Sequence, residues 1–539
     1  MGPAHARQHQ QRAGTHPTGV RATLRASGAG TRRAGHAAAG HGGTGCAPRR
    51  SDRRSRGRGV TPQLTPYVLA AGAQQADSDA VFEADTGRRI SHRELGDAVR
   101  RTADDLLGRG LRQGDTVGVR LSNGVDFVVA LHAVLTTGGS VVPVNPVHTA
   151  GEAQRQLEHA GADWLIDAVG GDGTRAAPLK RLTAPPSGAP AVPSESARTE
   201  VCPPAREASA PLREAGTAVL ASSSGTTGQP KTIRLSHGNM IAALAAGTAA
   251  LPLAPDDRVL AVLPFAHAYG LQAVLHHTLR CGGTVVTLAR YRPGPALRAM
   301  AEHGVTRLFV VPPQLRTLCA GQRDTPVNLD RLRGVVTGGA PVPPDLVADA
   351  RRVLAAPVLM GYGLTETAGY LAVAAGEDTP EPGRTAPVVA GVEHRVVHGE
   401  LWVRGPQVAR DAVDADGWLH TGDLVSLEHG ALRVTGRCKE LIKVNGYQVA
   451  PAELEELMQR HPAVADAAVA AVPDQARGEV PVAYVVLRAP AADAELAAFV
   501  NAQVAPYKRV QTVHRVGAIP RTASGKIVRR LLTVPAEPR

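Results

Sequence analysis

Cysteine is scarce in this 539-residue chain, and no cysteine stands at a spacing that suits a metal. The five cysteines are odd in number and widely scattered, without a CxxC or Cys/His pair: Cys46, Cys202, Cys281, Cys319 and Cys438. They indicate neither a disulfide framework nor a zinc site. Long apolar runs are missing as well: no stretch of about 18 uncharged apolar residues occurs, and the N-terminus lacks the apolar block of a secretory signal. We therefore expect a cytoplasmic protein without a membrane span.

Lysine is also rare. The sequence has six lysines against 54 arginines, so arginine serves wherever a bulk positive charge suffices. In such a chain, a lysine is expected where a compact ammonium is needed. Four of the six fall inside the motifs described below: Lys231, Lys439, Lys443 and Lys526.

The net charge of +12 is concentrated at the N-terminus. Residues 1–60 hold twelve arginines and a single acid, Asp52, a balance of +11, which leaves the rest of the chain close to neutral. Residues 1–59 have too few large apolar side chains to offset their ordering entropy, and we expect them to be disordered. Three interpretations stay open: a solvated extension, including an upstream start with the true start near Val60; an arm that binds RNA or DNA; and an organelle transit peptide. The near-neutral body argues against nucleic acid as a partner.

A chain of this length calls for more than one domain. Helix-like stretches alternate with β-branched segments at residues 116–121, 140–144 and 164–168, which predicts a parallel α/β sheet. Residues 170–215 are rich in Pro, Ala, Ser and Gly and are expected to form an irregular surface loop. Further on, Ser236 is expected to cap a helix that continues to Ala250.

The pattern changes after residue 436 to a compact α+β texture, with a helix expected at residues 451–459 and a strand at 482–487. The predicted fold class is therefore α/β. A large N-terminal α/β domain is expected at residues 60–436, and a small α+β C-terminal domain at residues 437–539.

A polar, glycine-rich turn follows the strand-like residues 217–221. Residues 222–231 (SSSGTTGQPK) have the composition of a phosphate cradle, because small residues let backbone N–H groups approach phosphates, hydroxyls add donors and Lys231 adds charge. Pro230 stands where a Walker A loop requires glycine, so the segment is not a Walker A loop. Taken alone it could also be a flexible Ser/Gly linker. Its place directly after an apolar strand favours the cradle.

Five segments together carry a resemblance to a known family. In chain order they are residues 222–231, 361–367 (GYGLTET), 416–423 (DGWLHTGD), 436–448 (GRCKELIKVNGYQ) and 520–526 (PRTASGK). They resemble the motifs of the adenylate-forming superfamily of acyl-CoA synthetases, luciferases and peptide-synthetase adenylation domains, and the resemblance covers roughly residues 64–530. Two further segments, 263–270 (LPFAHAYG) and 448–454 (QVAPAEL), are similar to the 4-coumarate- and fatty-acid-CoA ligase branch.

The resemblance implies a nucleotide site. Glu366 matches a Mg²⁺ ligand beside the phosphates, and Thr365 matches a donor to them. Tyr362 is implied to lie against adenine, while Asp423 and Arg437 are implied to contact the ribose. An exposed turn aspartate and an ion-paired arginine are the simpler alternatives for the last two. The implied ATP- or AMP-binding residues are Ser223, Ser224, Gly225, Thr226, Thr227, Gly228, Lys231, Gly339, Ala340, Pro341, Tyr362, Asp423, Arg437 and Gln448.

The resemblance also implies two half-reactions. Lys526 matches the lysine that bridges the substrate carboxylate and the α-phosphate, and the scarcity of lysine argues against the alternative of a basic tail. Lys439 aligns with a hinge about which the small domain is mobile. A second pose is implied to present Lys443, with Asn445 and Gly446 near the CoA thiol. The implied catalytic residues are Lys526, Glu366, Thr365 and Lys443.

The implied acyl pocket contains His267, Gly338 and Gly363. An ordinary core histidine remains the alternative for His267. Three positions depart from the family pattern and put the loop geometry and hinge kinetics in question: Thr232, Met360 and Cys438.

The predicted enzyme is an AMP-forming acid–thiol ligase that uses ATP, Mg²⁺ and CoA. It converts an aromatic or aliphatic carboxylic acid to acyl-AMP and then to acyl-CoA. Free amino acids are not expected as substrates, because residues 265–268 (FAHA) contain no acid to hold an ammonium. Two alternatives keep the adenylation and change the acceptor, to an amine or to a free-standing carrier protein. A nucleic-acid-binding protein that uses the basic N-terminal arm is the alternative from another class.

Overall fold

The structure is a computed structural model that describes residues 63–167, 180–183, 216–223, 231–340, 342–373, 387–428, 430–445, 447–522 and 525–532. These residues all belong to one unit of contacts, Val60–Arg539. The disorder expected for residues 1–59 lies outside the described residues, as does most of the loop expected at 170–215.

The first large sheet is parallel except at one edge. Its strands are β3 (Thr116–Arg120), β4 (Ser140–Pro143), β5 (Trp164–Asp167), β6 (Lys180–Thr183), β7 (Thr217–Ser223) and β8 (Lys231–Ser236), in the order β6-β5-β3-β4-β7-β8. Only β8 is antiparallel, to β7. The three β-branched segments predicted as parallel strands are confirmed as β3, β4 and β5. Strand β6 lies within the segment expected to be a loop, so that prediction is wrong for residues 180–183.

The second large sheet has eight strands and contributes to the candidate site. They are β1 (Asp79–Glu83), β2 (Arg89–Ser91), β9 (Arg258–Ala261), β10 (Thr284–Thr287), β11 (Arg307–Val310), β12 (Gly334–Gly338), β13 (Val358–Tyr362) and β14 (Ala372–Val373), in the order β14-β13-β12-β11-β9-β10-β1-β2. The six inner strands are parallel, and β2 and β14 are antiparallel edge strands. Strands β10 and β12 are buried along their whole length, as parallel strands covered on both faces are.

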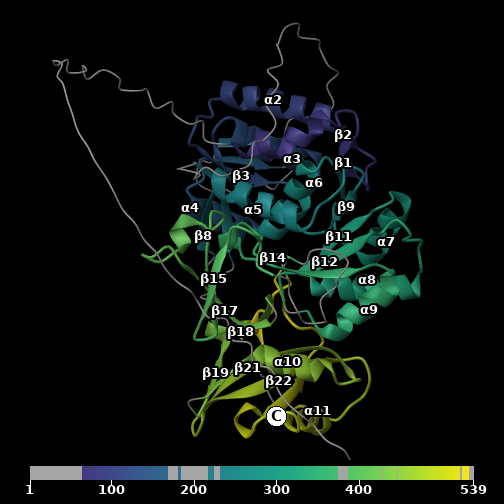
Figure 1. Cartoon of the computed structure of the whole chain (residues 1–539), viewed down its shortest axis with the longest axis vertical. Helices are drawn as coiled ribbons and strands as arrows, with labels where there is room; N and C mark the ends of the chain where they lie inside the picture. The colour runs from purple at the N-terminus through teal and green to yellow at the C-terminus, as the bar shows by residue number, and fades with distance from the viewer. Residues whose placement is uncertain are drawn as a thin grey trace, which may run out of the picture. The chain divides into compact units, whose positions relative to one another are not determined.

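Helices separate these strands in the sequence (Figure 1). They are α1 (Leu64–Leu69), α2 (His92–Gly108), α3 (Val125–Thr136), α4 (Ala150–Ala160), α5 (His237–Ala250), α6 (His277–Arg280), α7 (Pro293–Glu302), α8 (Pro312–Asp324) and α9 (Pro344–Leu354), with a π-helical segment η2 (Tyr269–His276) and short 3₁₀ turns η1 (Ala70–Ala73), η3 (Thr365–Thr367) and η4 (Arg410–Ala412). The Ser236 side chain accepts a hydrogen bond from the Asn239 backbone N–H and so caps α5, which ends at Ala250 as predicted.

A four-stranded antiparallel sheet follows, formed by β15 (Glu393–Val397), β16 (Glu400–Arg404), β17 (Leu419–Glu428) and β18 (Ala431–Arg437). The DGWLHTGD motif ends at Asp423 on strand β17, and Asp423 lies opposite Arg437 of strand β18 in the sheet register. The sheet therefore brings two of the predicted nucleotide-binding residues side by side.

The C-terminal part forms a small α+β unit with its own core. Its elements are η5 (Cys438–Glu440), β19 (Ile442–Val444), β20 (Tyr447–Val449), α10 (Pro451–Gln459), β21 (Val464–Asp474), β22 (Gly478–Leu487), α11 (Asp493–Asn501), η6 (Pro506–Lys508), β23 (Thr512–Arg515) and η7 (Arg529–Leu531). The sheet order is β20-β19-β22-β21, and β23 pairs with β22 in parallel. Leu454 and Met458 of α10 pack with Val469 and Val485 in a separate hydrophobic cluster. A large α/β part with a smaller α+β part confirms the predicted fold class.

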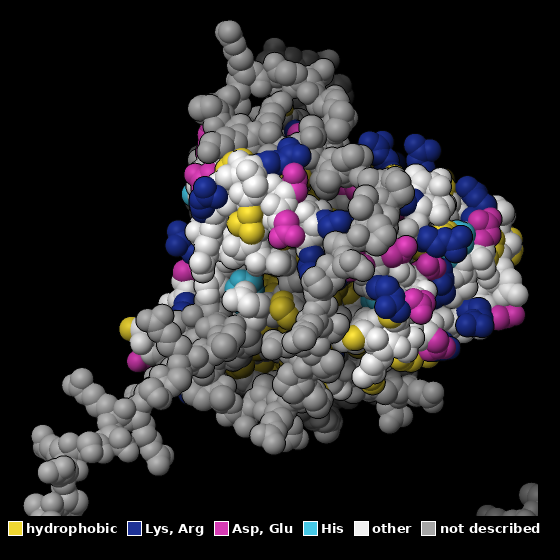
Figure 2. Space-filling view, turned by 90° about the horizontal axis from the view of Figure 1, so that it is seen from above, with side chains coloured by type: hydrophobic (Ala, Val, Ile, Leu, Met, Phe, Trp, Pro, Cys, Tyr) yellow, Lys and Arg dark blue, Asp and Glu magenta, His cyan; other side chains and the backbone are white. Residues whose placement is uncertain are grey.

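The described surface carries both signs of charge. On the face shown in Figure 2, basic and acidic side chains are interspersed, in keeping with the near-neutral body of the sequence. Among the described residues, no helix has both the length and the apolarity needed to cross a membrane.

Candidate active site

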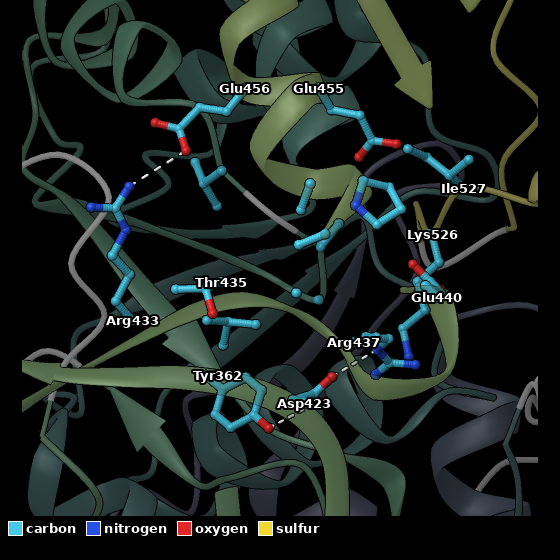
Figure 3. Close-up of a pocket in the computed structure, with 18 of the residues that line it drawn as sticks. Tyr362, Asp423, Arg433, Thr435, Arg437, Glu440, Glu455, Glu456, Lys526 and Ile527 are labelled. Atoms are coloured by element: carbon cyan, nitrogen blue, oxygen red, sulfur yellow. Dashed lines mark hydrogen bonds and ion pairs between the residues drawn. The ribbon is translucent and has the colours of Figure 1, made fainter. Parts of the chain in front are cut away.

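A cavity of about 640 Å³ lies between the large part and the small α+β part, and its size suits a ligand pocket. Gly339, Ala340 and Tyr362 line it from the ends of β12 and β13. Asp423 and Arg437 line it from β17 and β18. The small part contributes Glu440, three glutamates of α10 and the loop that carries Lys526 (Figure 3). Six predicted site residues, Gly363 included, therefore line one cavity together with Lys526.

Asp423 is held by two partners inside this cavity. The Tyr362 hydroxyl donates to Asp423 Oδ2 at 2.7 Å, and Arg437 Nε lies 2.7 Å from Oδ1 (Figure 3). The Asp423 side chain is only 2% exposed. Burial, together with the Asp423 carboxylate, raises the pKa of Tyr362 well above its usual range, so this hydroxyl stays protonated and donates.

The Lys526 ammonium has both acidic and basic side chains as neighbours. Burial and the nearby Arg437 guanidinium lower the pKa of its ammonium, while Asp423, Glu366 and Glu440 act in the opposite direction. Lys526, Asp423 and Arg437 line the same cavity, and the predicted metal ligand Glu366 acts on Lys526 from outside that lining. The structure thus brings the C-terminal lysine to the cavity that the predicted ribose contacts line.

Glu366 and Thr365 lie on η3, directly after β13. The Glu366 carbonyl accepts a hydrogen bond from the Ala409 N–H at 2.8 Å, which ties this turn to the segment that leads into η4. Both side chains are half-buried. Within the described ranges, no group of three His, Cys, Asp or Glu residues forms a metal site by itself.

The glycine-rich segment is described only at its ends. Ser223 ends β7, Lys231 begins β8, and the two pair with each other, so the intervening residues connect two neighbouring antiparallel strands. Five predicted phosphate-binding residues lie outside the described residues: Ser224, Gly225, Thr226, Thr227 and Gly228. Pro341 and Gly446 lie outside them as well.

Gly338 and Gly363 are glycines for a reason that the sequence did not reveal. A Cβ atom on Gly338 would stand 2.3 Å from the Gly361 carbonyl oxygen, and one on Gly363 would stand 2.1 Å from the Gly369 carbonyl oxygen. Backbone therefore fills the space beside both glycines. Their assignment to an acyl pocket stays a prediction, but a methyl group at either position would meet the protein itself.

His267 lies just before η2 and is half-buried. Its Nε2 atom is enclosed and has no hydrogen-bond partner among the described residues. Burial lowers the pKa of His267 to about 4, with smaller contributions from His148 and Lys526. His267 is thus a neutral imidazole near Lys526, with a free nitrogen.

The residues predicted for thiol transfer do not line the cavity. Lys443 and Gln448 pair with each other across the β19–β20 hairpin and are both exposed, and Asn445 lies at its turn with a φ of 50°. Gln448, predicted to bind the nucleotide, does not line the cavity; the lining from the small part comes from Glu440, helix α10 and the loop that carries Lys526. Lys439 is exposed on η5.

Sequence reasoning missed an acidic and basic wall of the cavity. Arg529 lies 3.1 Å from both Glu440 and Glu455, and burial raises the pKa of Glu455 against the opposing effect of Arg529. Arg433 pairs with Glu456 across the other end (Figure 3). The acids that open α10 were visible in the sequence, but their partners lie far away in the chain.

The chain is similar to known proteins in both sequence and fold. The profile of the family described as "AMP-binding enzyme" matches residues 69–411, and that of the "AMP-binding enzyme C-terminal domain" matches residues 453–526. The chain belongs to the AMP-binding enzyme family. The adenylate-forming superfamily expected from the five motifs is therefore confirmed. The two matches lie on either side of residues 437–439, where the domain boundary is predicted.

Curated relatives of this AMP-binding enzyme are CoA ligases. The "4-coumarate--CoA ligase 5" of Oryza sativa subsp. japonica is 33% identical over 87% of this chain and 93% of its own length. The "Peroxisomal OPC-8:0-CoA ligase 1" of Arabidopsis thaliana is 32% identical over 87% of this chain and 92% of its own. The predicted enzyme class, an AMP-forming acid–thiol ligase, is the class of these relatives.

Solved structures of family members superpose on most of the chain. The O-succinylbenzoate CoA synthetase of Bacillus subtilis, in complex with ATP and magnesium, has a TM-score of 0.73 and 27% identity over 86% of this chain and 98% of its own. The amide bond synthetase McbA of Marinactinospora thermotolerans has a TM-score of 0.74 and 26% identity over 87% of this chain and 98% of its own.

Proposed function

We propose that this AMP-binding enzyme couples a carboxylic acid to CoA in two half-reactions within the cavity described above. In the first, a carboxylate oxygen attacks the α-phosphorus of ATP, and the bond to pyrophosphate breaks to give acyl-AMP. In the second, the CoA thiolate attacks the acyl carbon and AMP leaves with its phosphate oxygen. The observation that carries the proposal is that Lys526, Asp423 and Arg437 line one cavity, with the Glu366 carboxylate near enough to oppose the lowering of the Lys526 pKa by burial.

Asp423 and Arg437 are proposed to hold the ribose. A carboxylate has about four lone-pair directions, so after its bonds to Tyr362 and Arg437 Asp423 can still accept from ribose hydroxyls. The Lys526 ammonium is proposed to approach both the substrate carboxylate and the α-phosphate. Its charge offsets the repulsion between these two anions and stabilises the charge that develops during attack.

Glu366 fits a Mg²⁺ ion that arrives with ATP. Mg²⁺ in phosphoryl-transfer sites is usually held by one or two carboxylates together with substrate phosphates, so a single half-buried carboxylate near Lys526 suits it. When bound, the ion neutralises charge on the phosphate oxygens. Thr365, on the same turn, is proposed to donate to those oxygens.

The chain is proposed to divide into an N-terminal extension at residues 1–59, a large domain at residues 60–436 and a small domain at residues 437–539. For the second half-reaction, the small domain is proposed to rotate about a hinge at Lys439. Support comes from the exposed β19–β20 hairpin, which holds Lys443, Asn445 and Gln448 outside the cavity while Lys526 occupies it. One cleft can serve two reactions in turn if rotation of the small domain replaces the segment that lines the cleft by another segment of the same domain.

The substrate is proposed to be an aromatic or aliphatic acid with an uncharged body. His267 is neutral, and residues 265–268 provide no carboxylate for a substrate ammonium. A neutral His267 therefore suits an acyl group that is apolar or carries a single hydrogen-bonding atom. It disfavours a free amino acid, because the charge of the ammonium would have no partner.

An amine acceptor is the second candidate, because the structural relative McbA is named an amide bond synthetase. A carrier-protein phosphopantetheine is a third acceptor with the same thiol chemistry. The cellular location is proposed to be the cytoplasm, where ATP and CoA are both present. The relative named peroxisomal makes the peroxisome the alternative, and a fluorescent fusion with marker proteins distinguishes the two.

The proposed function is tested in two stages. A pyrophosphate-exchange screen over aromatic and aliphatic acids identifies the activated acid, and CoA, amines and a carrier protein then compete as acceptors for that acid. We expect acid-dependent exchange and an acyl-CoA product. Exchange followed by an amide product would assign the McbA-like activity, and the absence of exchange with every acid would contradict adenylation.

A further inference from the structure

The loop that carries Lys526 is closed at its base. Arg521 and Ile527 form an isolated antiparallel bridge, and the Val528 N–H donates to the Pro520 carbonyl at 2.8 Å. Nearer the tip, the Thr522 N–H donates to the Lys526 carbonyl at 2.8 Å. The Lys526 N–H in turn donates to the Thr522 hydroxyl oxygen at 3.1 Å. The backbone of Lys526 is thus fixed from both sides of its peptide units.

The Arg521 guanidinium links this loop to the sheet of the small part. Its Nη2 lies 2.8 Å and 3.0 Å from the two carboxylate oxygens of Asp466, while its Nη1 donates to the Gly525 carbonyl at 2.9 Å. The side chains of Arg521 and Asp466 are only 20% and 26% exposed. A planar guanidinium can satisfy both acceptors at once, whereas an ammonium on a lysine stem has no such fork.

Asp466 is a firm anchor for this link. It lies near the start of β21, where the register with β22 shifts, and its Oδ1 also accepts the Ala467 N–H at 2.9 Å. The residues that follow, Ala467 to Val469, are fully buried in the small domain. The carboxylate therefore has one orientation, set by a well-packed strand.

The opposite side of the loop rests on the large domain. Gly525 has a φ of 82°, and a Cβ atom there would stand 3.3 Å from Val311 Cβ and 3.5 Å from Pro313 Cδ. The carbonyl that Arg521 grips belongs to this same glycine. Arg521 therefore fixes the peptide between Gly525 and Lys526 at the point where the loop meets the large domain.

We infer that Arg521, anchored by Asp466, is a positioning residue that holds the Lys526 loop in the geometry needed for adenylation. It acts through Lys526 and does not itself contact the reacting atoms. Lysine is long and flexible, so fixing its backbone lowers the entropy that must be lost when the ammonium reaches the reaction centre. The inference rests on the proposed function of Lys526, and the experiment keeps the two separable.

The test compares Arg521→Met with Lys526→Ala and with the double variant in pyrophosphate exchange. Because misplacement by about 1 Å can cost on the order of 10²-fold in rate, we expect Arg521→Met to lower the exchange kcat by about 10–100-fold. The KM values for ATP and acid should change little. In the Lys526→Ala background the same replacement should change exchange by less than about twofold, because residues that act as a unit are non-additive.

Arg515→Met is the matched control. Arg515 also bridges an aspartate and a backbone carbonyl in the small domain, with Asp493 at 2.7 Å and the Ala491 carbonyl at 3.0 Å, but neither partner belongs to the loop that carries Lys526. Its replacement should leave exchange unchanged. Thioester formation from supplied acyl-AMP should survive in both arginine variants, which separates positioning from a general loss of folding.

Asp466→Asn provides a second route to the same result. The amide keeps the shape and one acceptor for Arg521 but loses the charge, so we expect a smaller loss of exchange, about 3–10-fold, with thioester formation retained. Equal loss of both half-reactions, or an undiminished effect of Arg521→Met in the Lys526→Ala background, would overturn the positioning role. If Lys526→Ala itself leaves exchange intact, the proposed function of Lys526 fails instead.

Discussion

Asp423 shows how one side chain serves both the fold and the proposed site. The sequence predicted Asp423 as a ribose contact because the DGWLHTGD motif is specific. It could not show that the Tyr362 hydroxyl, 61 residues earlier, is its partner. Only the pairing of β17 with β18 and the adjacent end of β13 bring the hydroxyl, the carboxylate and Arg437 together.

The glycines of the motifs mark the limit of residue-level prediction. The resemblance implies that Gly338 and Gly363 belong to the acyl pocket, but a Cβ atom at either position would meet a backbone oxygen atom. Gly361 and Gly363 both line the cavity, but Gly361 is different because a Cβ atom there would have Val336 Cγ1 as its nearest neighbour, at an ordinary 3.6 Å. The sequence does not show which backbone or side-chain atoms lie beside each glycine, so it could not predict this difference.

Gly361→Ala is therefore expected to alter ligand use while preserving the fold. The added methyl group has ordinary room beside Val336 at a residue that lines the cavity, and one such group in a ligand pocket alters fit by about 1–3 kcal/mol. We expect kcat/KM to change at least about tenfold for some acids or for ATP, with an unfolding free energy within about 0.5 kcal/mol of wild type. Kinetics over the acid panel and urea unfolding measure both quantities.

Gly338→Ala is the matched variant and should behave in the opposite way. A Cβ 2.3 Å from the Gly361 oxygen forces β12 and β13 apart, so the unfolding free energy should fall by about 1–3 kcal/mol or more. A Gly338→Ala protein that is as stable as wild type and has an altered acid profile would contradict this expectation and support the acyl-pocket assignment.

Glu366→Gln should weaken the use of Mg·ATP without unfolding the protein. The amide retains the shape of the side chain but loses the hard anionic ligand that Mg²⁺ prefers. Pyrophosphate exchange is measured as a function of Mg²⁺ concentration, and the half-saturating concentration should rise by about tenfold or more. An unchanged Mg²⁺ dependence would remove Glu366 from the metal site.

Secondary structure was predictable where the pattern is local. The three β-branched segments became β3, β4 and β5, and the helix predicted at residues 451–459 is α10. The π-helical segment η2 was not predictable, because the sequence pattern does not distinguish it from an α-helix. The sequence also did not indicate that β1 pairs with β10, since about 200 residues separate these two strands.

Helix α10 carries a contact across the predicted domain boundary. Arg433 of β18 lies 3.4 Å from Glu456, and both side chains are partly exposed, at 39% and 28%. Such a pair contributes about 0.2–1 kcal/mol, which can bias two poses by up to about fivefold. Arg433→Met should therefore raise the ratio of the thioester-forming rate to the exchange rate by up to that factor.

Arg460→Met controls for the loss of charge around Glu456. Arg460 lies 2.7 Å from the other oxygen of the same glutamate but belongs to the end of α10, so its loss breaks no contact across the boundary. Single-turnover thioester formation and exchange are measured for both variants. An equal change of the ratio in both would show that the cross-boundary contact has no bearing on the poses.

For the whole molecule, the sequence predicted two folded parts, a near-neutral body and one nucleotide site, and the structure and the family comparisons agree with the fold class. It did not predict a buried histidine group in the large part. His132 and His277 are fully buried, and His277 Nδ1 lies 2.6 Å from the Tyr370 hydroxyl oxygen. Histidine is ambiguous in a sequence, because burial decides its charge state.

These histidines make stability depend on pH. Burial lowers the pKa of His132 and of His277 to about 4, below the ordinary value of 6.5, so the unfolded chain binds more protons than the folded one. The contribution of these histidines to the free energy of unfolding is fully present above about pH 6.5 and is lost as the pH falls toward 4. The expected loss is on the order of 1.4 kcal/mol per pH unit for each histidine.

Urea unfolding between pH 7 and pH 5 tests this dependence. His277→Gln removes one titrating group and should reduce the slope of unfolding free energy against pH by about 1.4 kcal/mol per pH unit. The absolute stability of the variant at pH 7 is expected to be lower, since a buried contact with Tyr370 is altered. An unchanged slope would show that His277 does not titrate on unfolding.

The central claim is that Lys526 serves adenylation and not thiol transfer. The decisive measurement is pyrophosphate exchange in parallel with single-turnover thioester formation from supplied acyl-AMP, for wild type and Lys526→Ala. Loss of a charge that acts in the transition state should lower exchange by about 10²–10³-fold or more, while the thioester step should stay within a few-fold of wild type. Equal impairment of both steps, or exchange at the wild-type rate, would contradict the division of labour proposed for this enzyme.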